Sequence, residues 1–135
     1  LSVKQDLVNI YIPAMQYAKA EPLLEEMVAA SEHPDFDDER AKERYLNNLG
    51  FVQVHLEEFP KAEANLRRAL LSAGEDHGCY VIKNLGLMYQ KMGYAAEAIQ
   101  EYRKALPLFE QHLSTDHPVA EFIRGALAEL ETQTS

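Results

Sequence analysis

The chain has 135 residues, of which 47% are hydrophobic and 26% charged, and a formal net charge of −9. This composition is ordinary for one globular domain with a core. The negative charge argues against nucleic-acid binding, because that depends on Lys and Arg neutralising phosphates. No apolar run reaches the roughly 18–20 residues that cross a bilayer, and the first residues lack the pattern of a signal peptide.

A single cysteine, Cys79, cannot form an internal disulfide, which favours a reducing compartment. We therefore expect a cytoplasmic protein with neither a membrane nor a nucleic acid as its partner. The chain begins with Leu inside a helical pattern. We interpret it as a piece of a longer protein.

Apolar periodicity predicts two helical pairs in the first half of the chain. Their helices cover residues 1–12 with 16–31, and 39–56 with 60–72. Pro13 is expected to close the first helix, because proline lacks the backbone donor. Pro34 interrupts the acidic connector between the pairs, and Asp37 or Asp38 is expected to cap the helix that follows. Gly74 is the expected C-cap of the fourth helix.

The second half predicts one further pair, residues 78–92 with 95–112, and a single last helix over 118–131. Gly93 is expected at the turn of the pair. Pro107 falls inside the second helix of this pair, which predicts a kink or an early end there. Asp116 is expected to cap the last helix, with Pro118 in its first turn.

The same landmarks recur in each pair. Four leucines are spaced by 42, 36 and 42 residues. The residue after each leucine is Gly, Ala or Val, as in Leu7-Val8, Leu49-Gly50, Leu85-Gly86 and Leu127-Ala128. The second helices repeat Ala20, Ala62, Ala98 and then Met27, Ala69, Ala105. Small residues let helix axes approach to about 8–10 Å. We expect Leu24, Leu66, Tyr102, Tyr11 and Tyr89 to fill the remaining space.

These landmarks resemble the tetratricopeptide repeat, and the spacing of 42 is most similar to its kinesin light-chain type. The resemblance implies an all-α, right-handed superhelical solenoid that forms a single domain, 1–135. Its parts would be repeats 1–31, 39–73 and 77–112 and a capping helix, 117–131. The capping helix would present Phe122, Ile123, Leu127 and Leu130 to the core, and Glu121, Arg124 and Glu129 to solvent. The sequence departs from the pattern at Val8, Met27 and Gln53, and it has no Trp.

The resemblance also implies a protein–protein interaction module, or scaffold, that binds a peptide segment of a partner in a concave groove. Asn9, Asn48 and Asn84 would hold the peptide backbone or, alternatively, would form hydrogen bonds between neighbouring helices. Arg44, Lys83 and Lys91 would bind acidic groups of the peptide. Phe51, Tyr80 and Leu87 would act as apolar anchors. The implied groove residues are Asn9, Arg44, Asn47, Asn48, Phe51, His55, Tyr80, Lys83, Asn84, Leu87 and Lys91. The groove would be basic on an acidic body, which favours an acidic partner.

Some relatives clamp a C-terminal carboxylate with two Lys, one Arg and two Asn. The matching positions here are Gln5, Asn9, Asn48, Tyr80 and Asn84, so both asparagines are kept and all three cations are missing. A charge-assisted clamp without its charges loses most of its affinity. This excludes binding of heat-shock protein C-termini.

No pattern in the sequence indicates catalysis, and we expect neither an enzyme nor a cofactor. His112, Asp116 and His117 have metal-ligand side chains, but helix capping explains their pattern and the spacing matches no zinc site. Asp76, His77 and Cys79 place a thiol near an imidazole, yet the other repeats lack this arrangement. The acidic stretch 32–39 lacks the central Gly of a calcium loop.

Two alternatives to peptide binding remain open. The apolar residues Val3, Leu7 and Ile10 on the first helix have no preceding repeat, which favours self-association through open repeat ends. The second alternative is that the chain forms the sensor or regulatory part of a larger regulator or enzyme.

Overall fold

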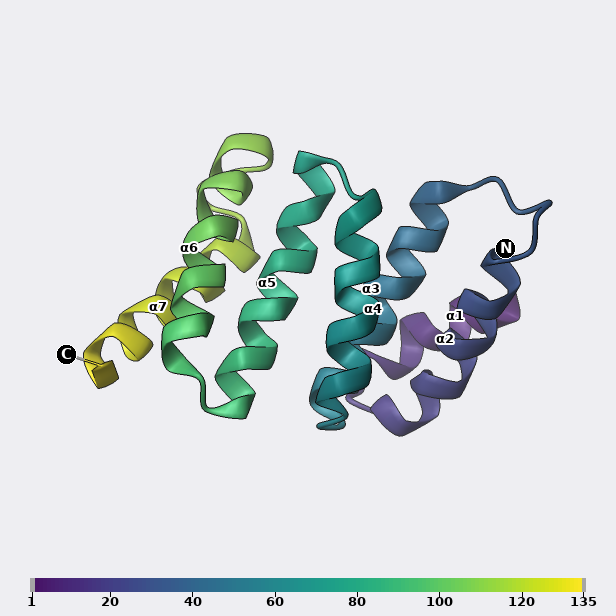
Figure 1. Ribbon diagram of the computed structural model, residues 1–135, viewed down its shortest axis with the longest axis horizontal. Coiled ribbons are helices and arrows are strands. Elements are labelled where there is room, and N and C mark those ends of the chain that lie inside the picture. The colour runs from purple at the N-terminus through teal and green to yellow at the C-terminus, as the bar shows by residue number, and fades with distance from the viewer. Residues whose placement is uncertain (1, 135) are drawn as a thin grey trace. The chain divides into compact units, whose positions relative to one another are not determined.

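The computed structural model describes the backbone of residues 2–134, and the side chains of these residues except at positions 75, 76 and 134. Asp76, considered above beside Cys79, therefore has its side chain outside the described residues. Every regular element in the described part is an α-helix (Figure 1): α1 (Val3–Tyr11), α2 (Tyr17–Ser31), α3 (Glu39–His55), α4 (Phe59–Ser72), α5 (Glu75–Met92), α6 (Ala95–His112) and α7 (Pro118–Thr134). The all-α helical repeat fold is confirmed, and the predicted helix ends differ from the observed ones by at most three residues.

The helices form two compact units, Leu1–Ser72 and Ala73–Ser135. In the first unit α1 packs against α2, α2 against α3, and α3 against α4. In the second unit α5 packs against α6, and α6 against α7. The grouping of all seven predicted helices into one domain stays a prediction.

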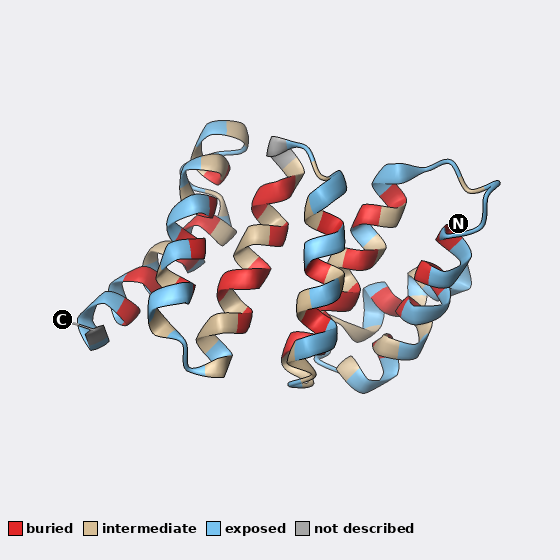
Figure 2. Ribbon diagram, viewed as in Figure 1, coloured by how far each residue is buried: buried red, intermediate tan, exposed pale blue. Residues whose placement is uncertain are grey.

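Buried positions recur along the helices of both units (Figure 2), and small residues among them allow close helix packing. A Cβ atom added to Gly50 of α3 would lie 2.5 Å from Cγ of Leu66 on α4, and one added to Gly86 of α5 would lie 2.7 Å from Cε1 of Tyr102 on α6. Leu66 and Tyr102 are wholly buried. The expectation that these two large side chains fill the space beside small residues is therefore confirmed.

The turns inside the three helical pairs share one hydrogen-bonding pattern. Met15, Glu57 and Gly93 have φ of 60°, 61° and 83°, the left-handed region. Each donates its N–H to the carbonyl three residues earlier, at 2.9–3.1 Å, and the next residue donates to the carbonyl five residues earlier, at 2.8–2.9 Å. This is the Schellman motif, which satisfies the last carbonyls of a helix. Gly93 was predicted at such a turn, whereas Met15 and Glu57 were not.

The helix caps agree with the sequence in one case and differ in two. Asp38 accepts a hydrogen bond from the Ala41 N–H at 3.0 Å, as predicted. Gly74 does not end α4; its extended backbone, with φ −78° and ψ 175°, is the N-cap of α5. The predicted cap at Asp116 is also wrong, because His117 Nδ1 accepts from the Val119 N–H at 3.1 Å. The imidazole nitrogen of His117 is thus the capping acceptor, in place of the expected carboxylate oxygen of Asp116.

Pro107 does not end α6 early, because the helix continues to His112. Proline removes one hydrogen bond from a helix interior. The buried residues Ala105 and Phe109 lie on either side of Pro107 in the chain and belong to the core that α6 shares with α5 and α7. Tertiary packing therefore offsets the lost bond.

The last helix, α7, has one buried side. Ile123, Leu127 and Leu130 belong to the core of the second unit. Phe122 was expected on this side but is 47% exposed, and its ring lies against that of Tyr102 with centroids 6.2 Å apart. It therefore lies at the edge of the core and only partly covers it.

Candidate functional site

Five of the predicted groove residues lie on one side of α3, because they are spaced at i, i+3, i+4, i+7 and i+11. Among them Arg44 is exposed, and the remaining four are half-buried: Asn47, Asn48, Phe51 and His55. The arginine guanidinium carbon lies 5.6 Å from the centre of the Tyr45 ring, within range of a cation–π interaction. The Tyr45 ring therefore packs against one side of the Arg44 side chain, and the rest of that side chain is exposed to solvent.

These five residues form a stripe along α3, and the C-terminal end of this α3 stripe forms an aromatic cluster with α2. The rings of Tyr17 and His55 are stacked, with centroids 4.4 Å apart and planes at 6°. Phe51 meets both rings edge-on, at 6.1 Å from Tyr17 and 4.6 Å from His55. Tyr17 was missing from the predicted site. Its place in the first turn of α2 was the only signal that could have suggested it.

The three asparagines predicted to hold a peptide backbone occupy three different environments. Asn9 on α1 is exposed, and its Oδ1 accepts from Gln5 Nε2 at 2.9 Å. Asn48 on α3 is half-buried, whereas Asn84 on α5 is only 3% exposed. Of the three, Asn9 and Asn48 therefore offer more surface to a ligand than Asn84.

The second unit carries a stripe with the same spacing on α5, formed by Tyr80, Lys83, Asn84, Leu87 and Lys91. Lys91 is exposed and Leu87 is half-buried. Burial lowers the pKa of Lys83 to about 8, because a desolvated ammonium holds its proton less tightly. The stripe thus combines a solvated cation with a desolvated one.

Tyr80, predicted as an apolar anchor, packs into its own unit. Its ring meets that of Phe109 edge-on with centroids 4.9 Å apart, and its hydroxyl lies 3.5 Å from Nε2 of His117. Burial raises the pKa of Tyr80, and the neighbouring Cys79 adds to the effect. Cys79 itself is wholly buried. Much of the Tyr80 side chain therefore packs against the core of the second unit.

A buried polar residue that the site prediction omitted joins three helices of the first unit. Gln53 on α3 is 1% exposed, donates from Nε2 to Glu21 Oε2 on α2 at 3.1 Å, and accepts at Oε1 from Asn65 Nδ2 on α4 at 2.8 Å. In the sequence, Gln53 stood out only as a departure from the repeat pattern.

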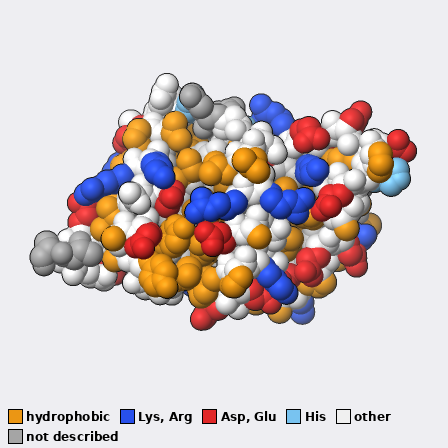
Figure 3. Space-filling model, in the orientation of Figure 1, with side chains coloured by type: hydrophobic (Ala, Val, Ile, Leu, Met, Phe, Trp, Pro, Cys, Tyr) orange, Lys and Arg blue, Asp and Glu red, His pale blue; other side chains and the backbone are white. Residues whose placement is uncertain are grey.

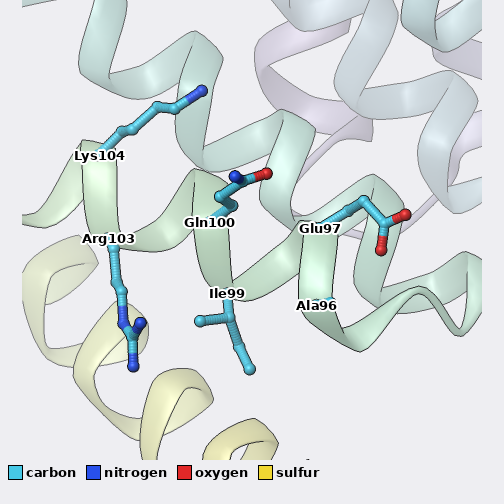
Figure 4. A pocket seen from close by; sticks show the side chains of 6 residues that line it. All are labelled: Ala96, Glu97, Ile99, Gln100, Arg103 and Lys104. Carbon is cyan, nitrogen blue, oxygen red and sulfur yellow. The ribbon is translucent and has the colours of Figure 1, made fainter.

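Two surface hollows lie along the second helices of the pairs. One, of about 320 Å³, lies in the first unit between α2 and α4, with Leu49 and Gln53 of α3 among its lining residues. The other, of about 550 Å³, follows α6 (Figure 4), where Ile99 and Arg103 point to one side and Lys104 to the other. Arg103 pairs with Glu131 of α7 at 3.0 Å. None of the predicted groove residues lines either hollow.

Comparison with known families finds a match for part of the chain. Residues 82–119, which span most of α5, all of α6 and the start of α7, match the sequence profile of the tetratricopeptide repeat. This segment of the chain thus matches one tetratricopeptide repeat. Repeats of this kind generally mediate protein–protein interactions and are typically non-catalytic.

The fold of this repeat protein is similar to that of a solved structure, BtubC (BKLC) from P. vanneervenii. The two share 16% sequence identity with a TM-score of 0.78, and the match covers 97% of this chain and 54% of the other. This repeat protein thus spans about half the length of that chain, and the likeness concerns the fold alone. No curated protein matches the sequence.

Two further properties of the repeat protein follow from its described residues. Among them, no cluster of three or more His, Cys, Asp or Glu side chains is arranged to hold a metal ion. Within the same part of the chain, no helix combines the length and apolar character required to cross a membrane.

Proposed function

We propose that this repeat protein is a protein–protein interaction module whose two units each bind a peptide segment of a partner, the first unit on the stripe of α3 and the second on the stripe of α5. The observation that carries the proposal is that two helices, one in each unit, present the same five-position spacing. Each stripe combines a cation, an amide and an apolar side chain, as in Arg44, Asn48 and Phe51 of α3. Amides pair with any peptide backbone, because they donate and accept at once.

The chemistry of the two stripes favours an acidic partner segment. Across the whole chain, acidic residues outnumber basic ones by 22 to 13, and both signs are interspersed on the face shown in Figure 3. The stripes differ from this average, because their charged residues are Arg44, Lys83 and Lys91. Such local charge favours association with carboxylate-bearing segments and makes that association sensitive to salt.

A peptide array tests this proposal with wild type beside the double variant Arg44→Ala, Asn48→Ala. We expect the variant to bind acidic peptides about tenfold more weakly, because it loses one charge-assisted contact and one amide contact. Arg67→Ala on α4, which removes an exposed arginine from the same unit, is the matched control and should bind as wild type does. Circular dichroism establishes that all three are folded. Equal binding by both variants, or no bound acidic peptide in wild type, would overturn the proposal.

Self-association is a second candidate, favoured by an exposed apolar face on α1. Val3 and Ile10 are 73% and 61% exposed, whereas Val52, the α3 residue at the repeat position of Ile10, is wholly buried. Apolar residues at such a position are normally covered by another helix.

Light scattering across a range of protein concentrations tests the second candidate. We expect the wild-type mass to rise with concentration and the variant Val3→Glu, Ile10→Glu to remain monomeric, because burying two carboxylates in the interface is costly. Leu71→Glu is the control, since Leu71 is 89% exposed on α4. A monomeric wild type at all concentrations would exclude self-association through α1.

A further inference from the structure

The last helix, α7, begins with a histidine as its N-cap. The carbonyl of His117 accepts from the Glu121 N–H at 3.1 Å, which is the first backbone hydrogen bond of the helix. The side chain of the same residue accepts at Nδ1 from the Val119 N–H, also at 3.1 Å. Pro118 between them has no N–H, so the Val119 donor is the first at this end that needs a partner. The imidazole supplies that partner.

This hydrogen bond fixes where the imidazole carries its proton. A backbone N–H only donates, so Nδ1 of His117 must be the unprotonated nitrogen, and the neutral ring carries its proton on Nε2. That nitrogen faces the Tyr80 hydroxyl at 3.5 Å. A second proton has only Nδ1 to occupy, where it would face the Val119 N–H as one donor against another. Positive charge is also unfavourable at the N-terminus of a helix, because the helix dipole is positive there.

The ring of His117 lies against the core that α7 covers. Its centroid is 5.6 Å from that of Phe109 on α6 and 6.2 Å from that of Tyr80 on α5. Phe109 is wholly buried and belongs to the same core as Ile123 and Leu127 of α7. The cap therefore connects the start of α7 with both other helices of the second unit.

The charged groups near this imidazole offer a second proton little compensation. On α6, Glu110 is already paired with Arg124 of α7 at 3.1 Å, and His112 in the last turn adds a positive charge when it is protonated. Asp116 precedes the ring and Glu121 lies in the first turn of α7, and both residues are exposed. Water and salt weaken the attraction of exposed carboxylates for a cation.

We propose that His117 is an acid-sensitive cap, and that proton uptake on its Nδ1 releases the start of α7 from the second unit. Histidine is the side chain whose ordinary change of charge falls between pH 5 and 8. An aspartate cap, as expected at Asp116, would remain an acceptor over that range. Loss of the cap weakens the cover that Ile123, Leu127 and Leu130 place over the core. This regulation lies beyond the proposed peptide binding and does not depend on it.

The direction of the pH dependence follows from which state takes up the proton without loss. In the unfolded chain the imidazole has no cap to maintain, whereas the folded protein gives up the hydrogen bond to Val119. Acid therefore favours the unfolded chain. The stability that the cap contributes is complete near pH 8 and is lost as the pH falls towards 5.

Thermal unfolding of wild type and His117→Asn between pH 5 and 8 tests the cap. Asparagine is a good N-cap that accepts from the same N–H and does not titrate in this range. The loss of ring packing lowers the stability of the variant equally at every pH. We therefore expect its melting temperature to rise by about 3–6 °C relative to wild type as the pH falls from 8 to 5.

His33→Asn is the matched control. His33 Nδ1 also accepts from the N–H two residues later, that of Asp35 at 3.1 Å, but it lies in the connector between α2 and α3. The Asp35 carboxylate is 3.8 Å from the same nitrogen and favours its protonation, so the control should show no such rise. A difference between wild type and His117→Asn that does not change with pH, or one that the control reproduces, would overturn the proposal.

NMR spectra of the wild-type protein examine the cap directly. Long-range nitrogen–proton correlations identify the tautomer, and we expect neutral His117 to carry its proton on Nε2. Amide exchange then locates the consequence. From pH 8 to 5, the protection of the α7 amides, corrected for the intrinsic exchange rate, should fall about tenfold in wild type and stay constant in His117→Asn. A neutral ring protonated on Nδ1, or α7 protection that is the same at both pH values, would contradict the acid-sensitive cap.

Discussion

Gly86→Ala is expected to destabilise the protein by about 2–3 kcal/mol, although alanine is the better helix former. The new Cβ would lie 2.7 Å from Cε1 and 2.8 Å from Cδ1 of Tyr102, distances at which some atom must move. The tyrosine ring cannot swing aside easily. It is wholly buried, and its hydroxyl donates to Gln90 Oε1 at 2.8 Å. Relief of the clash therefore has to come from separation of α5 and α6.

Denaturant unfolding followed by circular dichroism measures this effect, and Gly125→Ala is its control. Gly125 lies on α7, and a Cβ added there meets nothing within 4 Å. The control should therefore gain stability, by about 0.5–1 kcal/mol, from helix propensity alone. A Gly86→Ala protein as stable as the control would contradict the packing argument.

A double-mutant cycle identifies the clash partner. In a Tyr102→Leu background the ring that Gly86→Ala strikes is absent, so the alanine should cost less than it does beside tyrosine. Equal costs in the two backgrounds would mean that the destabilisation arises elsewhere in α5.

The same contacts explain why the fold was predictable from the sequence. Two helices approach closely only where one of them carries a small residue, and that requirement recurs in each repeat. Gly50 beside Leu66 and Gly86 beside Tyr102 therefore mark the register of the helices in the sequence itself. Helix ends followed from the same register and from the local chemistry of Pro13, Asp38 and Gly93.

The errors arose where backbone conformation did not follow from residue type. Met15 and Glu57 occupy the left-handed region, which costs a non-glycine residue roughly 1–2 kcal/mol and is therefore not expected for either. Only their alignment with Gly93 in the repeat could have revealed these turns. Gly74 was assigned to the wrong helix, because glycine serves at both the C-terminal and the N-terminal end of helices.

The candidate site was only partly predictable, because spacing defines the side of a helix but not how deeply each position is covered. Asn48 and Asn84 hold equivalent positions, yet one is half-buried and the other 3% exposed. Tyr80 was expected to face a ligand from its repeat position, but its ring packs against that of Phe109. Gln53 is the converse case, since its polar side chain is accommodated in the core by partners on α2 and α4.

Lys83→Met is expected to raise the free energy of unfolding by about 1–2 kcal/mol at pH 7. Burial lowers the pKa of Lys83 from 10.5 to about 8, so the folded protein holds this proton less tightly than the unfolded chain does. The lysine therefore reduces stability at pH values below 8, and that loss is recovered as the pH rises from 8 towards 10.5. Methionine has a similar length and no charge to desolvate, so the variant should lack this pH dependence.

Unfolding measurements between pH 7 and 10 compare wild type with Lys83→Met and with Lys91→Met, the control. Lys91 is exposed on the same helix, so its replacement should leave both the stability and its pH dependence unchanged. An Lys83→Met protein that is less stable than wild type would show that the partners of the lysine outweigh its desolvation. If the variant is more stable and also loses acidic peptides from the array, the lysine at this position serves binding at the expense of stability. Stabilisation without any change in peptide binding would remove Lys83 from the proposed interaction surface.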